Sequence, residues 1–350
     1  MRGTMFLAAL ALAAAPLTAQ EVQRISGGDV AVYNVAGSVE VVRGSGSDVV
    51  VRITRRGADA DELVVETGEI GGRETLRVIY PSDEIVYPEM GRGSSSSSSV
   101  RADGTFGDGG RDRDRDRVRV RGSGTGLEAW ADLVVEVPSG SRFSMYLMVG
   151  EIDARDLDSD VSLDTGSGEV TATNIRGSLD VDTGSGRITV RGVAGDLSVD
   201  TGSGQVDVAD VVGRDVSLDT GSGGITAIGI EADLLDVDTG SGSIRLDQIV
   251  ARDVIVDTGS GSVDVELLTD IDRLEVDTGS GSVTVSAPED LGAMVEIDTG
   301  SGGIDLDFPL EVRSVRRDHV EGRLGDGRGT IAIDTGSGSI RILQGASRVR

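Results

Sequence analysis

One short motif, Asp-Thr-Gly-Ser-Gly, holds the residues of this sequence whose types could do chemistry. A carboxylate next to a Thr-Gly-Ser turn could serve acid–base hydrolysis if a second carboxylate lay about 3 Å away and shared its proton, as in aspartic proteases. The motif occurs nine times, however, and nine equivalent carboxylates do not define a pair. The sequence therefore predicts a chain that is not an enzyme, with no catalytic residues.

The spacing of the motif predicts the elements that carry it. Successive copies are 18 to 21 residues apart, except for a last interval of 36 residues that contains an insertion around residues 309–329. Apolar residues alternate with polar ones before each motif, as at Leu179 and Val181, and after it, as at Ile188 and Val190. A period of two is typical of strands with one buried face.

Two short strands cannot close a core, so the units must stack on one another. The sequence therefore predicts an all-β fold, a right-handed parallel β-solenoid (β-helix) of about nine to ten rungs. Its hand follows the rule for parallel crossovers. Residues 147–157 align with residues 165–175, with Gly150 at the position of Gly168, and predict one further rung without the Asp-Thr-Gly-Ser letters.

The residues of the motif are expected to have different roles at a sharp corner. Glycine tolerates a turn where a side chain would collide with the neighbouring rung. Thr183 should point inward or lie at the corner, whereas Asp182 points away from the core because its neighbour Val181 points into it.

Equivalent aspartates on successive rungs would then form an outward acidic ladder, the candidate site for a cation or another ligand. Carboxylates about 4.8 Å apart repel by roughly 0.9 kcal/mol in water, so they attract counterions. The members are Asp164, Asp182, Asp200, Asp219, Asp238, Asp257, Asp277, Asp298 and Asp334.

Two interpretations of this ladder stay open beside the protease. The aspartates could simply satisfy a repeated turn. Alternatively they could form a weak divalent-cation ladder, because calcium takes hard oxygen ligands, although the nonapeptide of calcium-loaded β-rolls is missing. The sequence predicts no cofactor, unless the ladder binds calcium.

The regions outside the repeats differ in composition. Residues 1–19 have the layout of a secretory signal peptide. The Ser-, Gly- and Arg-Asp-rich stretch cannot bury a core and is expected to be a disordered insertion. The predicted organisation is a signal peptide at 1–19, an irregular strand-rich N-terminal β cap or early rungs at 20–80, the insertion at 81–126, and the β-solenoid at 127–350.

Three single features complete the prediction. Trp130 belongs to a strand that enters the solenoid and is expected in the core or cap. His319 is the only histidine and is expected to be an exposed loop residue. The last rung, around residues 330–343, is expected to close the rod.

Charge and cysteine content limit the partners. The formal net charge of −27 repels nucleic acid and anionic membranes and attracts cations. The sequence has no cysteine, which excludes disulfides and thiolate metal sites. No segment after the signal peptide approaches the length of a transmembrane helix. We expect an exported protein of the periplasm, the cell envelope or the extracellular space, with no nucleic-acid partner.

The segment VEVPSG at 135–140 and the closing run GDGRGTIAIDTGSGSIRI at 325–342 carry a resemblance. Together with the glycine-cornered repeats, they resemble the bacterial exported putative-adhesin family of β-strand repeat proteins, which is related to the head-GIN domains. The resemblance implies a surface or envelope role and gives no catalytic or binding residues to carry over.

The expected function is a non-enzymatic, adhesin-like or envelope scaffold protein that presents a repetitive acidic surface. Its partner would be a cell-surface polysaccharide, another envelope protein or the chain itself. The alternatives are a calcium-dependent structural protein similar to a β-roll and a polysaccharide-acting enzyme, which would need clustered carboxylates and basic residues that depart from the repeat.

Overall fold

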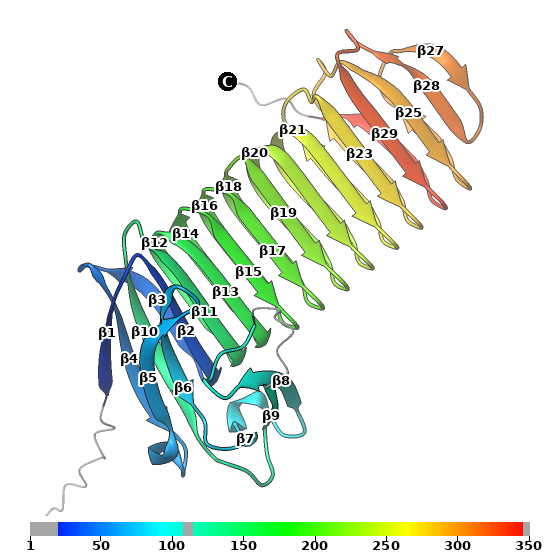
Figure 1. Cartoon of the computed structure of the whole chain (residues 1–350). Coiled ribbons are helices and arrows are strands. Elements are labelled where there is room, and N and C mark those ends of the chain that lie inside the picture. Colours follow the sequence, from blue (N-terminus) through cyan, green and yellow to red (C-terminus); the bar gives the residue numbers. More distant parts are fainter. Residues whose placement is uncertain (1–19, 108–114, 346–350) are drawn as a thin grey trace, which may run out of the picture.

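The computed structural model describes residues 20–107 and 115–345, and the expected signal peptide at 1–19 lies outside them. The fold is all-β, a stack of mostly parallel strands in one 27-stranded sheet that coils into an elongated solenoid, with a second sheet of three strands near its N-terminal end (Figure 1). Among the described residues, no helix has the length and apolar character needed to cross a membrane.

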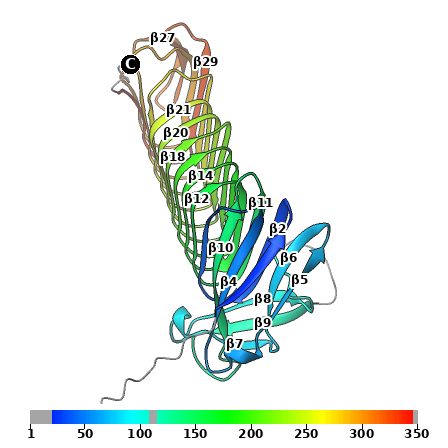
Figure 2. The ribbon, with the colours of Figure 1, turned by 90° about the vertical axis from the view of Figure 1, so that its left-hand side faces the viewer.

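Each coil contributes one strand to each of two ladders, which Figure 2 shows along the rod. We call the ladder of strands that lead into the motif the aspartate face. In spatial order its strands are β6 (Arg73–Ile79), β2 (Asp29–Ala36), β11 (Arg142–Val149), β13 (Asp160–Ser167), β15 (Leu179–Thr183), β17 (Leu197–Thr201), β19 (Asp215–Thr220), the second halves of β20 (Ile225–Thr239) and β21 (Ile244–Thr258), β23 (Arg273–Thr278), β29 (Gly329–Thr335) and β25 (Ala293–Thr299).

The strands after the motif form the opposite face. In spatial order they are β10 (Trp130–Pro138), β3 (Val39–Gly44), β12 (Ile152–Asp158), β14 (Val170–Arg176), β16 (Ile188–Ala194), β18 (Val206–Val212), the first halves of β20 and β21, β22 (Val263–Leu267), β24 (Val283–Ala287), β30 (Ile340–Gln344) and β26 (Ile304–Leu306).

The core is a set of aliphatic columns between these two faces. Val181 pairs in register with Leu163 on one side and Val199 on the other, and all three are buried. On the opposite face, Ile188 lies between Val170 and Val206 in the same way. Because the apolar stripe of each coil is covered by its neighbours, the period-two pattern of the sequence becomes a continuous core.

The N-terminal region adds a coil that is out of chain order. β3 lies between β10 and β12, and β2 lies between β6 and β11, so residues 29–44 stack directly on the predicted degenerate rung of β11 and β12. That rung is confirmed, because Leu147 and Ile152 pair with Thr165 and Val170. Antiparallel strands complete this end: β1 (Glu21–Ser26), β4 (Asp48–Arg56) and β5 (Val64–Ile70), with the short 3-10 helix η1 (Ala60–Glu62).

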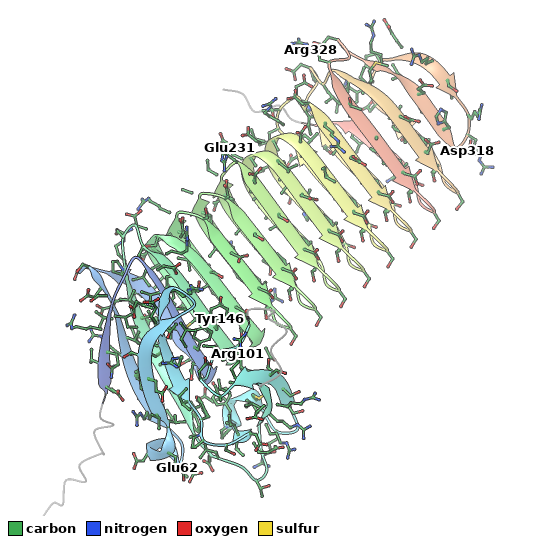
Figure 3. The ribbon with its side chains drawn as sticks, viewed as in Figure 1. Glu62, Arg101, Tyr146, Glu231, Asp318 and Arg328 are labelled. Carbon is green, nitrogen blue, oxygen red and sulfur yellow. The ribbon has the colours of Figure 1, made fainter. Side chains whose placement is uncertain are left out.

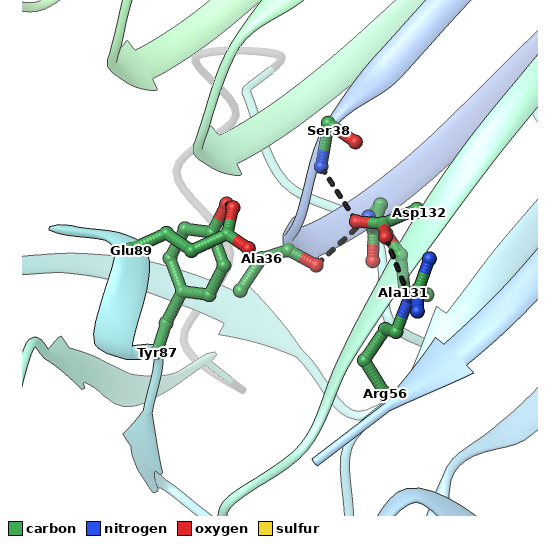
Figure 4. Close-up of polar contacts among 8 residues, drawn as sticks. Ala36, Ser38, Arg56, Tyr87, Glu89, Ala131 and Asp132 are labelled. Carbon is green, nitrogen blue, oxygen red and sulfur yellow. Dashed lines mark hydrogen bonds and ion pairs between the residues drawn. The ribbon is translucent and has the colours of Figure 1, made fainter.

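Polar contacts hold the out-of-order coil to its neighbours (Figure 4). The backbone N–H of Ser38 donates to Asp132 of β10 at 3.2 Å, and Asp132 also pairs with Arg56 of β4 at 3.0 Å. Deeper in the fold, the amide of the fully buried Asn34 donates to the carbonyl oxygen of Ala131 at 2.8 Å, and the Tyr80 hydroxyl donates to Asn34 at 2.9 Å. β2, β4 and β10 are therefore joined at one junction with Tyr80, the residue that follows β6.

The prediction of disorder at 81–126 is wrong for the part of this segment that the structure describes. β7 (Glu84–Val86), β8 (Ser95–Arg101) and β9 (Arg115–Arg121) form the three-stranded sheet, accompanied by the 3-10 helix η2 (Pro88–Met90), whereas residues 108–114 lie outside the described residues. The apolar side of this sheet packs on the outer side of β2 and β11. The contact forms a second hydrophobic core, separate from that of the solenoid, which contains Tyr33, Met148, Ile85, Val100, Phe106, Val118 and Val120. The serines of β8 gain order because apolar partners distant in sequence cover one side of the sheet.

The C-terminal end corrects two further expectations. The last repeat does not close the rod, because β29 lies between β23 and β25, and β30 lies between β24 and β26. The end is covered on the aspartate face by an antiparallel hairpin of β27 (Leu310–Val315) and β28 (His319–Leu324). His319 is therefore a partly buried strand residue and not an exposed loop residue.

Candidate ligand-binding face

The nine predicted aspartates form one column along the aspartate face. Strand pairing places each beside the next in register, in the spatial order Asp164, Asp182, Asp200, Asp219, Asp238, Asp257, Asp277, Asp334 and Asp298. Their side chains lie on the outer side of the strands, while the threonine that follows each one is buried. The structure thus brings all nine predicted site residues together.

Aromatic rings continue the same column beyond its N-terminal aspartate. Tyr146 pairs with Asp164, and Tyr33 pairs with Tyr146. The two tyrosine rings are stacked, with centroids 4.6 Å apart and planes 5° apart, and Phe106 meets Tyr33 edge-on at 5.8 Å. Figure 3 shows Tyr146 where the three-stranded sheet meets the solenoid. The acidic column therefore begins against an aromatic cluster.

The threonines of the motif point inward and serve the fold. Thr239 Oγ1 donates to the carbonyl oxygen of Gly223, in the preceding coil, at 3.0 Å, and five other threonines make the equivalent bond. Three threonines of the N-terminal coils are equally buried, but their hydroxyls have no hydrogen-bond partner among the described residues; these are Thr165, Thr183 and Thr201.

The second glycine of each motif is required by the distance between coils. A Cβ at Gly186 would lie 1.8 Å from the carbonyl oxygen of Gly168, and Gly186 has φ +151°, where side chains are strained. The column extends beyond the motifs, because a Cβ at Gly150 would lie 1.8 Å from the oxygen of Gly37. The threonine and glycine of each motif thus make contacts between coils. The aspartate and serine side chains of the motif are the ones that remain available to bind a partner.

Burial and mutual repulsion change the acidity of the column. Partial burial, followed by the charges of Asp182 and Asp180, raises the pKa of Asp164 to about 7. Burial and then neighbouring carboxylates also raise the pKa of four further members, Asp182, Asp219, Asp257 and Asp334. Both causes disfavour the charged form.

The geometry does not select a proteolytic pair. An aspartic protease holds two carboxylates about 3 Å apart at one place, with pKa values driven apart. Here Asp182 and each of the other interior aspartates lie between two equivalents on strands that pack about 4.8 Å apart. No two of them form a unit distinct from the rest.

A shallow hollow that was not predicted from the sequence lies beside the aspartate column. Along β11 to β19, its floor is the outward position two residues before the aspartate column, where four of the five side chains are serine. The hollow has a volume of about 360 Å³, and the residues of its floor are Ser144, Ser162, Asp180, Ser198 and Ser217. The serines that recur two residues before aspartate were the signal that could have revealed it.

The two faces of the solenoid differ in charge. The aspartate column and the column two residues before it contain no basic residue from β11 to β25, as far as the paired strands show. The opposite face carries arginines in ion pairs, such as Arg187 with Asp207 at 2.5 Å and Arg245 with Asp247 at 2.8 Å. The aspartate column itself therefore has no arginine within it, although Glu275 and Asp196 on the same face pair with Arg273 and Arg214.

At the far end of the column, His319 Nδ1 lies 2.8 Å from Asp298 Oδ1. Asp334, Arg316 and Asp318 line a hollow beside this pair, and Figure 3 shows Asp318 at this end of the rod. Within the part of the chain that the structure describes, no group of three or more acidic, histidine or cysteine side chains is arranged to hold a metal ion.

Comparison with known proteins gives a family and two distant structures. A "putative cell adhesion protein" from Clostridium sporogenes is 11% identical, with 93% of this chain and 99% of that chain covered and a TM-score of 0.22. A "putative lipid binding protein" from Parabacteroides distasonis is 13% identical, with 93% and 97% covered and a TM-score of 0.39. These scores are too low for either likeness to bear on function. No curated protein matches the sequence.

The family model described as Toastrack DUF4097 matches residues 130–343, which is more than half of the chain and includes all nine motifs. The expected relation to the head-GIN domains stays a prediction. The repeats, the coiled parallel strands and this match together establish that the chain belongs to the Toastrack DUF4097 family, a family of unknown function.

Proposed function

We propose that this protein is a non-enzymatic, exported adhesin-like or envelope scaffold module whose aspartate face binds a periodic partner. The observation that carries the proposal is the register of two outward columns, the nine aspartates and, beside the first four of them, Ser162, Asp180, Ser198 and Ser217. A right-handed coil of nine to ten rungs, as the repeats predict, would present these groups at a rise of about 4.8 Å. Such a surface matches a partner that itself repeats.

The favoured partner is an extended polysaccharide of the cell surface. Serine hydroxyls both donate and accept hydrogen bonds, and ionised carboxylates accept them, so together they suit the hydroxyl groups of sugars. The small side chains of Ser162, Ser198 and Ser217 leave the hollow open. The column of nine aspartates contains no basic residue, so its negative charge disfavours anionic chains and favours neutral or cationic ones. Another envelope protein or a second copy of this chain remains within the proposal.

The proposed location is the periplasm, the cell envelope or the extracellular space. The signal-peptide pattern at residues 1–19 supports export. Fractionation of cells that express the full chain, followed by detection of the protein in each fraction, tests the location.

A binding experiment on the hollow tests the function. The protein would be applied to an array of neutral, cationic and anionic linear polysaccharides, together with a double variant, Ser198→Arg and Ser217→Arg, that fills the hollow. The matched control is Thr189→Arg and Thr226→Arg, at outward positions of the opposite face. We expect binding to a neutral or cationic polymer that falls at least about tenfold in the first variant and is unchanged in the second. Equal binding by both variants would refute the proposed face.

A divalent-cation-dependent scaffold is the alternative, and the in-register pairing of like charges along the column is the observation that favours it. Repelling carboxylates gain stability from counterions. Calcium, however, takes six to eight oxygen ligands, whereas a carboxylate in this column has equivalents only on the two adjacent coils. A cation bound only to the folded state would raise the melting temperature, so melting with and without millimolar calcium tests this alternative.

A polysaccharide-acting enzyme is the remaining alternative. It would need an acid and a base whose pKa values are driven apart. Among the described carboxyl groups, those with a raised pKa all belong to the one column. Release of reducing ends from the bound polysaccharide would favour this alternative.

A further inference from the structure

The coil formed by β29 and β30, residues 329–344, fills a slot whose two walls come from other parts of the chain. β29 pairs with β23 on one side and with β25 on the other. On the opposite face, β30 pairs with β24 and β26. All four wall strands precede this coil in the sequence. The last repeat therefore fills a gap between existing coils instead of extending an end.

The contacts that hold this coil are those that recur along the whole rod. The backbone N–H of Gly281, in one wall, donates to Ser337 at 2.9 Å, and the N–H of Gly338 donates to Ser301, in the other wall, at 3.0 Å. Thr335 Oγ1 donates to the carbonyl oxygen of Gly281 at 3.0 Å. The buried aliphatic side chains of the coil are Ile331, Ile333, Ile340 and Ile342.

An empty slot would leave the strands of both walls without hydrogen-bond partners along one edge. β23 and β25 would each present an unpaired edge, and the aliphatic side chains beneath them would lose their cover. Every contact that repairs this comes from the coil itself. A coil from a second copy is chemically identical and would make the same contacts.

The connection into the slot is short and contains glycine. Residues 325–328 join the hairpin strand β28 to β29, with φ +49° at Gly325 and +71° at Gly327. The N–H of Gly327 donates to Leu324 at 3.0 Å and closes the turn. A few residues of this kind are sufficient as a hinge, because they can absorb a large change of φ and ψ without a steric penalty.

From this topology we propose that the 329–344 coil exchanges between two copies of the chain. The product is a reciprocal dimer in which the coil of each copy fills the slot of the other. Exchange takes place during folding, because the walls form from earlier sequence and a filled slot holds its coil from both sides. This inference deepens the part of the proposed function that names the chain itself as a partner, and polysaccharide binding does not depend on it.

The absence of cysteine from the sequence permits a direct test by mixed cross-linking. One full-length variant carries Asp298→Cys and another carries Asp334→Cys, two outward positions that are paired in register across the slot wall. The two proteins are unfolded together, refolded as a mixture and treated with a short bismaleimide. Within one unexchanged copy a single thiol has no partner, so a covalent heterodimer requires exchange.

The matched control mixes Asp200→Cys with Asp219→Cys. These positions are also paired in register, but on coils that follow one another in the chain. We expect at least about tenfold more covalent heterodimer from the Asp298 and Asp334 mixture than from this control. Equal yields from the two mixtures would overturn the proposal.

A second measurement needs no cysteine variant. The unmodified chain is refolded over a hundredfold range of concentration, and its mass is followed by light scattering. Exchange predicts a dimer fraction that rises with concentration during refolding and persists after dilution. Four glycine and serine residues inserted after Asp326 lengthen the hinge and should lower that fraction. Refolding to monomer alone at every concentration would contradict the inference independently of the polysaccharide test.

Discussion

Asp277 is paired in register with Asp334, although Asp298 is the next aspartate of the series along the chain. The last repeat is thus internal to the stack, and the coil that precedes it in sequence lies at the end under the hairpin of β27 and β28. The N-terminal coil of β2 and β3 is placed out of chain order as well. Both ends of the rod are therefore held by strands that are not neighbours in sequence.

The order of the coils predicts which cysteine pairs can be joined within one chain. Neighbouring parallel strands lie about 4.8 Å apart, within the Cα separation that a disulfide spans, whereas the next strand but one lies about 9.6 Å away. We expect mild oxidation to close a disulfide in Asp277→Cys with Asp334→Cys and not in Asp277→Cys with Asp298→Cys. Mass spectrometry of the digested monomer measures both. If only Asp277→Cys with Asp298→Cys formed a disulfide, the coils would stack in the order of the sequence and the observed order would be wrong.

The threonine column predicts opposite effects for the same substitution at two copies of the motif. Thr239→Val removes the hydrogen bond to Gly223 and leaves that carbonyl without its partner, so it should lower the free energy of unfolding by about 1–2 kcal/mol. Thr183→Val removes a buried hydroxyl that has no described partner and should be neutral or stabilising. Chemical denaturation compares them, and equal losses would mean that the bond to glycine is not the reason for threonine.

The glycine column predicts contrasting effects at adjacent residues. A Cβ at Gly302 would lie 1.9 Å from the oxygen of Gly338, whereas a Cβ at Gly303 would meet no atom within 4 Å. Gly302→Ala should therefore destabilise the protein by about 1–3 kcal/mol, as overpacking does, and Gly303→Ala should change it little. Thermal melting of both variants measures this, and similar melting temperatures would show that the coils can separate at little cost.

The acidic column predicts that stability depends on pH. The pKa of Asp164 is about 7 in the folded protein and near its ordinary value of 3.8 when unfolded, so the folded state binds this proton more tightly. Its charge therefore destabilises the fold fully above about pH 7, and the penalty declines as the pH falls toward 4. The remaining aspartates with a raised pKa act in the same direction.

Substitution of Asp164 tests this dependence. Asp164→Asn should raise stability at pH 8 by on the order of 1–2 kcal/mol, because its partial exposure screens the full effect, and should do little at pH 4. Asp264→Asn, on the opposite face, is the control and should retain the pH profile of the parent protein. An equal gain in the stability of Asp164→Asn at pH 8 and at pH 4 would mean that the charge of Asp164 is not its cause.

Repetition made much of the fold predictable from the sequence. The alternation of apolar and polar residues around each motif predicted the strands. Val181 and Ile188, which it predicted to be buried, are buried in the structure. The degenerate rung could be found because Gly150 occupies the position equivalent to Gly168 when residues 147–157 are aligned with residues 165–175. The outward column of aspartates followed from the same parity, because a residue next to a buried strand residue points to the other side.

The sequence by itself therefore determined the coil, its inner aliphatic stripe and the residues on its surface, since each depends only on local periodicity. Only the tertiary structure decided the order in which coils stack, the packing of the 84–121 strands on β2 and β11, and the pairing of His319 with Asp298. Nearly identical repeats offer nearly identical edges, so local sequence cannot distinguish which coil adjoins which. The order of the coils therefore depends on the loops and caps, whose contacts join residues far apart in the chain.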